Sequence, residues 1–258
     1  VLFYRGRLLP PDFFAIAVVG TRRPTPYGLA MAERLASELA SRGVVVVSGM
    51  ARGIDGSAHR GALKAGGKTI AVLGCGVDIV YPPEHRRLMD EIIESGLVLS
   101  EFPPGTPPWS QNFPLRNRII SGLAFGVVVV EARERSGALI TADLALGQGR
   151  DVFAVPGPVT SEQSRGPLQL LKDGAKIVTG AADVLEEYGL SERETSYEQV
   201  TVGLEEEVVL NYISYTPIHI DELVEKTGLN VHSLGAILTH LELKGLISRL
   251  PGSMYSRK

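Results

Sequence analysis

The sequence is poor in features that would each fix a functional class. Its 258 residues include one cysteine, Cys75, which excludes an internal disulfide framework and a multi-cysteine zinc site. No apolar run approaches the roughly 20 residues that a membrane-spanning helix needs. The net charge is −3, so binding to nucleic acid has to come from a local basic patch. These features predict a cytoplasmic protein without a metal site or a membrane segment.

Short β-branched runs alternate with helical segments through most of the chain. Continuous apolar strands joined by crossover helices predict an α/β fold, a mostly parallel sheet with helices on both faces. Such sheets bind ligands at the carboxyl ends of their strands. The predicted strands are Ala15–Val19, Val44–Ser48, Thr69–Leu73, Leu97–Ser100, Gly126–Glu131, Val152–Val155 and Lys176–Val178. The predicted helices are Tyr27–Arg42, Gly56–Ala65, Glu84–Ser95, Pro114–Leu123, Gly137–Leu146 and Pro167–Lys172.

The first predicted strand ends in a candidate anion site. A glycine loop leads into a helix start with Thr25 as N-cap and Pro26 at the first helical position. Gly20 lets a phosphate approach the backbone, and the helix start offers unpaired N–H groups and the positive end of its dipole. The alternative is a tight turn with two solvated arginines. The candidate residues are Gly20, Thr21, Arg22 and Arg23.

The second predicted strand ends in Ser48-Gly-Met-Ala-Arg-Gly-Ile-Asp55. A dinucleotide-binding protein would carry Gly-x-Gly-x-x-Gly in its first loop and an acid near this strand end, and neither is present. This region can therefore accept a phosphate but would not hold a ribose in the usual way. We interpret Asp55 as the N-cap of the next helix and His59 as a half-buried helix residue.

Two further segments carry aromatic residues that could stack on a base. The proline-rich loop Ser100–Trp109 carries the single tryptophan, which either packs on the core, the favoured interpretation, or stacks on a base. In the segment Phe113–Gly122, helical spacing places an aromatic, a cation and an amide on one face, which suits a stacked base and its phosphate. The alternative is a surface helix end with solvated arginines. That face holds Phe113, Arg116, Asn117 and Ile120, with Arg118 pointing elsewhere.

The C-terminal part has a different character. Residues 1–187 form the predicted α/β domain, and residues 188–203 are polar and predict a linker. Residues 204–258 predict three helices and a hairpin, a small winged-helix domain, with seven acids against five Lys/Arg. A helix that reads duplex DNA normally brings several cations, so a structural or protein-contact role is favoured. The chain opens on Val1 inside a strand-like run, and we expect a further piece upstream.

Together the motifs closely resemble those of the DNA processing protein A family. They follow in colinear order as Gly20-Thr-Arg with Tyr27-Gly28, Ser48–Asp55, Phe113–Gly122, Glu131-Ala with Ser136–Ala142, and Phe153–Gly157. Family members often carry a C-terminal winged helix too. Two positions depart from the family pattern: His85 stands where Asn is common, and Gly166–Leu168 stands where Gly-Thr-Asn is common.

The resemblance implies an extended Rossmann-like domain that binds single-stranded DNA, protects it and helps to load the RecA recombinase during natural transformation and DNA recombination. It implies no catalysis and no cofactor, and we expect a homodimer. The resemblance places the DNA-binding site at Gly20, Thr21, Arg22, Ser48, Gly49, Phe113, Arg116 and Asn117, and we add Arg23 and Arg52.

Two other functional classes stay open. The fold looks related to nucleoside-monophosphate phosphoribohydrolases, but their Pro-Gly-Gly-x-Gly-Thr loop is missing, and Glu131–Gly137 stands in that region. A transcriptional regulator would read duplex DNA with the winged helix, and the weak basic character of that domain argues against it.

Overall fold

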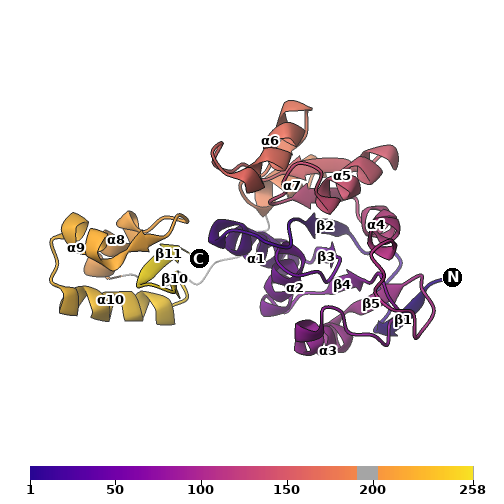
Figure 1. Cartoon of the computed structure of the whole chain (residues 1–258), viewed down its shortest axis with the longest axis horizontal. Coiled ribbons are helices and arrows are strands. Elements are labelled where there is room, and N and C mark those ends of the chain that lie inside the picture. Colours follow the sequence, from indigo (N-terminus) through magenta and orange to yellow (C-terminus); the bar gives the residue numbers. More distant parts are fainter. Residues whose placement is uncertain (191–202, 258) are drawn as a thin grey trace. The chain divides into compact units, whose positions relative to one another are not determined.

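The computed structural model describes residues 1–190 and 203–257. The chain divides into two compact units, Val1–Arg193 and Glu194–Lys258, each with its own sheet (Figure 1). Residues 191–202, most of the predicted linker, lie outside the described residues, so the linker stays a prediction. Among the described residues, no helix combines the length and the apolar character that crossing a membrane requires.

The first unit is built on an eight-stranded sheet in the order β1-β5-β4-β3-β2-β6-β7-β8. β1 pairs antiparallel with β5, and every other pairing in this sheet is parallel, which confirms the predicted mostly parallel sheet. The strands are β1 Phe3–Gly6, β2 Ala15–Val19, β3 Val45–Ser48, β4 Thr69–Val72, β5 Leu97–Ser100, β6 Gly126–Val129, β7 Asp151–Ala154 and β8 Lys176–Ile177.

Helices cover both faces of this sheet, as predicted (Figure 1). Alternate residues of β2 point to opposite faces: Ala15 and Ala17 pack with α4, α5 and α6, whereas Ile16 and Val18 pack with α1, α2 and α7. The helices are α1 Pro26–Ser41, α2 Ile54–Lys64, η1 Pro83–His85, α3 Arg86–Ser95, α4 Asn112–Leu123, α5 Gly137–Gly147, η2 Glu162–Ser164, α6 Arg165–Lys172 and α7 Ala181–Glu187.

The strand order creates a crevice at the carboxyl edge of the sheet. β2 and β6 are neighbours, but the chain leaves β2 toward α1 on one face and leaves β6 toward α5 on the other. The two loops therefore separate, and a doubly wound sheet binds its ligands at such a point. The glycine loop that follows β2 lies at this position.

The structure corrects several local expectations. Asp55 is not an N-cap, because α2 begins at Ile54 after Gly53, whose positive φ of 77° favours glycine. α4 begins at Asn112, two residues before the predicted start at Pro114, and a proline is tolerated there because it lies in the first helical turn. Helix α7 is an addition to the predicted elements. Tyr188 does not behave as a linker residue, because it packs on Phe14 with ring centres 5.0 Å apart.

The second unit confirms the predicted winged helix. Its three helices pack on a three-stranded antiparallel sheet of order β10-β11-β9, in which the hairpin β10–β11 is the predicted part. Its buried apolar residues form a separate core, which includes Leu223, Leu234 and Leu241. The elements are α8 Leu204–Tyr212, β9 Ile218–His219, α9 Ile220–Thr227, α10 Val231–Leu243, β10 Ile247–Leu250 and β11 Met254–Arg257.

Candidate nucleic-acid interface

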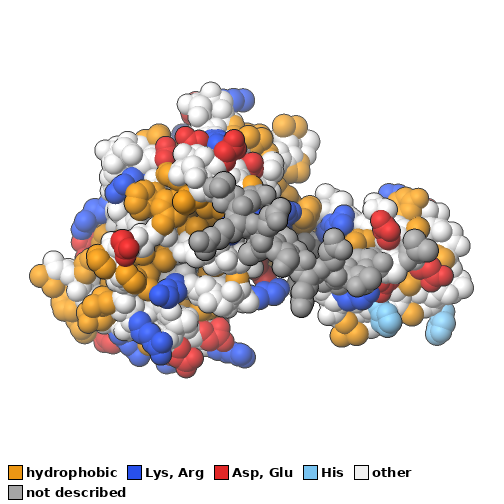
Figure 2. All heavy atoms as spheres, turned by 180° about the vertical axis from the view of Figure 1, so that it is seen from behind, with side chains coloured by type: hydrophobic (Ala, Val, Ile, Leu, Met, Phe, Trp, Pro, Cys, Tyr) orange, Lys and Arg blue, Asp and Glu red, His pale blue; other side chains and the backbone are white. Residues whose placement is uncertain are grey.

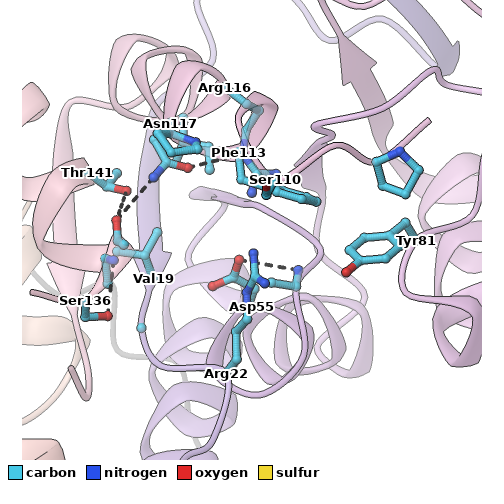
Figure 3. Close-up of a pocket in the computed structure, with 17 residues that line it drawn as sticks. Val19, Arg22, Asp55, Tyr81, Ser110, Phe113, Arg116, Asn117, Ser136 and Thr141 are labelled. Atoms are coloured by element: carbon cyan, nitrogen blue, oxygen red, sulfur yellow. Dashed lines mark hydrogen bonds between the residues drawn. The ribbon is translucent and has the colours of Figure 1, made fainter. Parts of the chain in front are cut away.

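A cavity of about 410 Å³ lies at the crevice, where the end of β2, the segment after β3 and the start of α5 meet helix α4 (Figure 3). All four residues that we placed on one face of α4 line it: Phe113, Arg116, Asn117 and Ile120. The other lining residues are Val19, Gly20, Arg22, Ala51, Asp55, Tyr81, Pro108, Ser110, Pro114, Ser136, Gly137, Ala138 and Thr141.

Arg116 is a buried cation held by backbone carbonyl groups. Its side chain is 3% exposed, and its guanidinium donates to the carbonyl of Gly49 at 2.7 Å and to that of Val72. Burial lowers its pKa to about 10, so Arg116 stays charged at neutral pH. Arg116 thereby links α4 to the ends of β3 and β4 and sets a fixed positive charge in the cavity wall.

Asp55 places a carboxylate in the same wall. A Cβ built on Gly49 would lie 2.6 Å from Arg116 Nη2 and 2.7 Å from Asp55 Oδ2, so glycine is required between the two charges. Burial raises the pKa of Asp55, while Arg116, Arg22 and the Ala51 N–H oppose this shift by favouring the charged form. The buried charge of Arg116 needs a counter-ion, and Asp55 supplies it.

Arg22 is the exposed cation of the cavity, and it lies against an aromatic ring. Its guanidinium carbon is 5.0 Å from the centre of the Phe113 ring, within the range of a cation–π interaction. The same ring packs tightly on Gly74 and lies 5.5 Å from the ring of Tyr81. A base can therefore stack on the Arg22 side of Phe113 only by displacing the guanidinium.

The start of α1 is not open to a phosphate, contrary to our expectation. Thr25 caps the helix as predicted, and the buried carboxylate of Glu131 accepts hydrogen bonds from the Thr25 N–H at 2.9 Å and its hydroxyl at 2.6 Å. The Glu131 carbonyl accepts the N–H of Thr21 at 2.7 Å. A carboxylate of the protein itself therefore occupies the anion position that we assigned to a phosphate.

The start of α5 is open instead. Ser136 caps this helix, the first turn contains no acidic residue, and its first two positions, Gly137 and Ala138, line the cavity. A Cβ built on Gly137 would meet no heavy atom within 4 Å, so there is free space beside the helix start. Asn117 Nδ2 and the Thr141 hydroxyl both donate to the Gly137 carbonyl, which fixes the position of this turn (Figure 3). The sequence indicates Ser136 as a cap, but it does not show that α5 faces Arg22.

Five of the predicted site residues lie outside the cavity lining in the described part of the chain. Ser48 is fully buried, and its hydroxyl donates to the Val18 carbonyl at 2.6 Å. Gly49 supports Arg116, as described above, and Thr21 accepts the N–H of Arg23 at 3.2 Å. Arg52 forms a two-pronged ion pair with Glu84, and Arg23 is exposed. Their contact with DNA stays a prediction.

Trp109 is exposed rather than packed on the core. It retains 55% of its accessible surface, and its two neighbours, Pro108 and Ser110, line the cavity. An exposed indole beside a cationic cavity is the arrangement that single-strand-binding proteins use for stacking. Trp109 is therefore a stronger candidate for base stacking than Phe113.

Charges elsewhere on the chain are mixed. The face shown in Figure 2 carries both basic and acidic side chains, and the chain has 26 Lys and Arg against 29 Asp and Glu. In the second unit, Lys226 pairs with Glu222 and Lys244 pairs with Glu206, so these lysines are already neutralised. The described residues contain no cluster of His, Cys, Asp and Glu that could hold a metal ion.

The comparisons with known proteins identify the family. Residues 1–189 match the family model of DNA recombination-mediator protein A. The chain belongs to this family. Residues 199–253 also match the model of the DprA winged helix domain, so both units of the chain have a counterpart among the family models.

Individual relatives agree with this assignment. Protein Smf of Escherichia coli K12 is 43% identical over 97% of this chain and 70% of its own length. DNA processing protein A of Streptococcus pneumoniae is 49% identical with a TM-score of 0.70, over 72% of this chain and 65% of the pneumococcal chain. The Helicobacter pylori protein, whose structure is described in terms of its single-stranded DNA binding mode, is 33% identical with a TM-score of 0.67, over 72% of this chain and 86% of its own.

Proposed function

We propose that this protein binds single-stranded DNA at the cavity and acts as a recombination mediator, which protects incoming DNA and loads the RecA recombinase during natural transformation. The observation that carries the proposal is the pairing of an open helix start with an exposed cation. The start of α5 and Arg22 face one cavity, and helix N-termini with arginines are a recurring site for phosphate.

The dimensions and surroundings of the cavity favour a single strand over a duplex. A cavity of about 410 Å³ accommodates one nucleotide unit, whereas a duplex would have to be read by an exposed element that enters a groove. The exposed Trp109 supplies a stacking surface that an unpaired base can reach. Membership of the recombination-mediator family and the single-stranded DNA binding mode described for the Helicobacter pylori relative support the same ligand.

The proposal includes a cytoplasmic homodimer with RecA as partner, and it includes no catalysis and no cofactor. The competing enzymatic function rests on one observation, the buried carboxyl group of Asp55 in the cavity wall. A chromatographic assay for base release from nucleoside monophosphates tests this alternative. We expect no free base, and release by the wild type but not by Asp55→Asn would favour the enzyme.

Substitution of Arg22 tests the proposed site. Arg22→Ala should weaken binding to an oligothymidylate and lower the salt dependence by roughly 0.7 in slope, because one phosphate contact is lost. Fluorescence anisotropy across a salt series measures both quantities. Arg118→Ala is the matched control, because Arg118 pairs with Glu101 outside the cavity and should leave the slope unchanged. Equal slopes for wild type and a folded Arg22→Ala protein would remove Arg22 from the site.

A further inference from the structure

The formal charge of the cavity indicates which kind of phosphate group the cavity accepts. Among the described residues that line the cavity, three have acidic or basic side chains: Arg22, Arg116 and Asp55. The guanidinium groups of Arg116 and Arg22 favour the charged form of Asp55, and with Asp55 ionised the three side chains sum to a net charge of +1. Glu131 is not among the residues that line the cavity, and its carboxylate accepts hydrogen bonds from Thr25 at the start of α1.

We propose that Asp55 is a specificity-determining residue that restricts the cavity to a phosphodiester, the single-charged group inside a DNA strand, and rejects the doubly charged phosphomonoester of a free nucleotide. This inference rests on the proposed binding of single-stranded DNA. A phosphodiester with one negative charge is neutralised by the net charge of +1. A phosphomonoester carries up to two negative charges at neutral pH, so one of them would stay unpaired in a partly buried site.

The position of Asp55 makes this role possible. Asp55 is the second residue of α2, and its carboxylate occupies the positive end of that helix, as Glu131 occupies that of α1. A carboxylate of the protein therefore lies at the start of α1 and at the start of α2, whereas the first turn of α5 contains no acidic residue. The groups that face Asp55 are Arg116 from α4, Arg22 and the Gly20 N–H from the loop after β2, and the N–H of Ala51.

Asp55→Asn changes the charge without removing the cation beside it. Arg116 remains bonded to the carbonyl groups of Gly49 and Val72, so its guanidinium keeps its place when the carboxylate is lost. An asparagine has almost the same shape and still accepts a hydrogen bond from Ala51. The variant therefore raises the cavity charge from +1 to +2 and isolates the effect of charge.

The test is a competition experiment with the full chain at pH 7.5. A labelled oligothymidylate without terminal phosphates is displaced by thymidine 5′-monophosphate or by its methyl phosphodiester. For the wild type, we expect the diester to displace the oligothymidylate at a concentration at least about tenfold lower than the monoester needs. The reason is that an unpaired charge in such a site is costly. For Asp55→Asn we expect the ratio to fall to about one. Asp90→Asn on α3, which makes the same change at an exposed position, should keep the wild-type ratio.

A pH series gives a second readout that does not depend on a variant. The second pKa of a phosphomonoester is about 6, so at pH 5 the monoester carries one charge and its disadvantage with the wild type should disappear. Equal competition by the two ligands at pH 7.5, no competition by either, or an unchanged ratio in a folded Asp55→Asn protein would overturn the inference. Failure of the oligothymidylate to bind would instead overturn the proposed function itself.

Discussion

At the scale of single residues, two aromatic rings at the cavity differ in how much of their surface is exposed. The ring of Phe113 is covered by Arg22 and packed on Gly74, whereas Trp109 is 55% exposed. Trp109→Ala should therefore weaken single-strand binding by roughly 1–3 kcal/mol without lowering the melting temperature. Phe113→Ala should lower the melting temperature, because it leaves a hole over Gly74.

The fluorescence of the single tryptophan can be used to detect its contact with DNA. Stacking of a base should quench the fluorescence of Trp109, and the chain has no other tryptophan to mask the signal. Titration with oligothymidylate measures the quenching, and Trp109→Phe, which keeps an aromatic face, should retain most of the affinity. An unchanged emission spectrum at saturating DNA would show that Trp109 lies outside the contact.

His59 gives a prediction about stability and pH. It is fully buried, and its Nδ1 lies 2.7 Å from the Thr69 hydroxyl, which itself donates to the Val46 carbonyl. Nδ1 is therefore the protonated nitrogen of a neutral ring, and burial lowers the pKa of His59 to about 3 from 6.5. Below pH 6.5 the unfolded chain takes up a proton that the folded chain does not, so this residue lowers stability as the pH falls from 6.5 toward 3.

Between pH 6.5 and 3, His59 should lower the free energy of unfolding by about 1.4 kcal/mol for each unit that the pH falls. Urea unfolding at several pH values measures it, and His59→Asn, which can still donate to Thr69, should reduce the slope by one proton. Above pH 7 the two slopes should coincide, because His59 is neutral in both states there. A wild-type slope that matches the variant below pH 6 would mean that His59 titrates normally.

At the scale of elements, α1 makes a tight contact with the segment that follows β6. Gly28 lies in the first turn of α1, and a Cβ built on it would overlap the Glu131 carboxylate that holds Thr25. Gly28→Ala should therefore cost about 1–3 kcal/mol of stability through overpacking. Glu131→Ala should cost a similar amount, about 1–3 kcal/mol, because it leaves buried donors of Thr25 without a partner.

The combination of the two changes tests the contact. In the Glu131→Ala background the added methyl group of Gly28→Ala has space, so the second substitution should cost much less than it does alone. Urea unfolding of the four proteins gives the coupling free energy. Strictly additive effects would mean that α1 already moves away from Glu131 in the single variant.

The same contact shows what sequence patterns can and cannot predict. Local signals locate β2, the Thr25 cap and the face of α4 that holds Arg116, because these depend on spacing of a few residues. The pairing of Thr25 with Glu131 spans 106 residues, and no local pattern contains it. The sequence therefore predicts an anion site at a helix start, but which helix start is open depends on a tertiary contact.

Burial is a second property that local patterns do not predict, and it distinguishes residues that look equivalent in the sequence. Arg22 and Arg116 are both candidate phosphate contacts by sequence, yet Arg116 is bonded to carbonyl groups in the wall and Arg22 is exposed. A pattern gives the residue type and the face, but not whether the charge is already satisfied by the protein. Trp109 illustrates the reverse case, because its apolar character favours packing and the loop geometry leaves the indole exposed.

At the scale of the whole molecule, the two units have separate cores. In the described part of the chain, the apolar clusters of the α/β unit contain no residue of the winged helix, and the core of the winged helix is built from its own residues, such as Val209, Leu234 and Ile247. Every residue that lines the cavity belongs to the α/β unit. Each unit therefore buries its own apolar surface, which is what independent folding requires.

Removal of the winged helix should consequently leave single-strand binding within a few-fold of the intact chain. The truncated chain should comprise residues 1–190, because Tyr188 packs on Phe14 and donates to Asp151 at 2.8 Å, and a cut after residue 187 would remove these contacts. Circular dichroism establishes that the shorter chain folds, and anisotropy titrations at matched salt compare the affinities. A folded chain of residues 1–190 that loses more than about tenfold in affinity, about 1.4 kcal/mol, would place part of the DNA site on the winged helix.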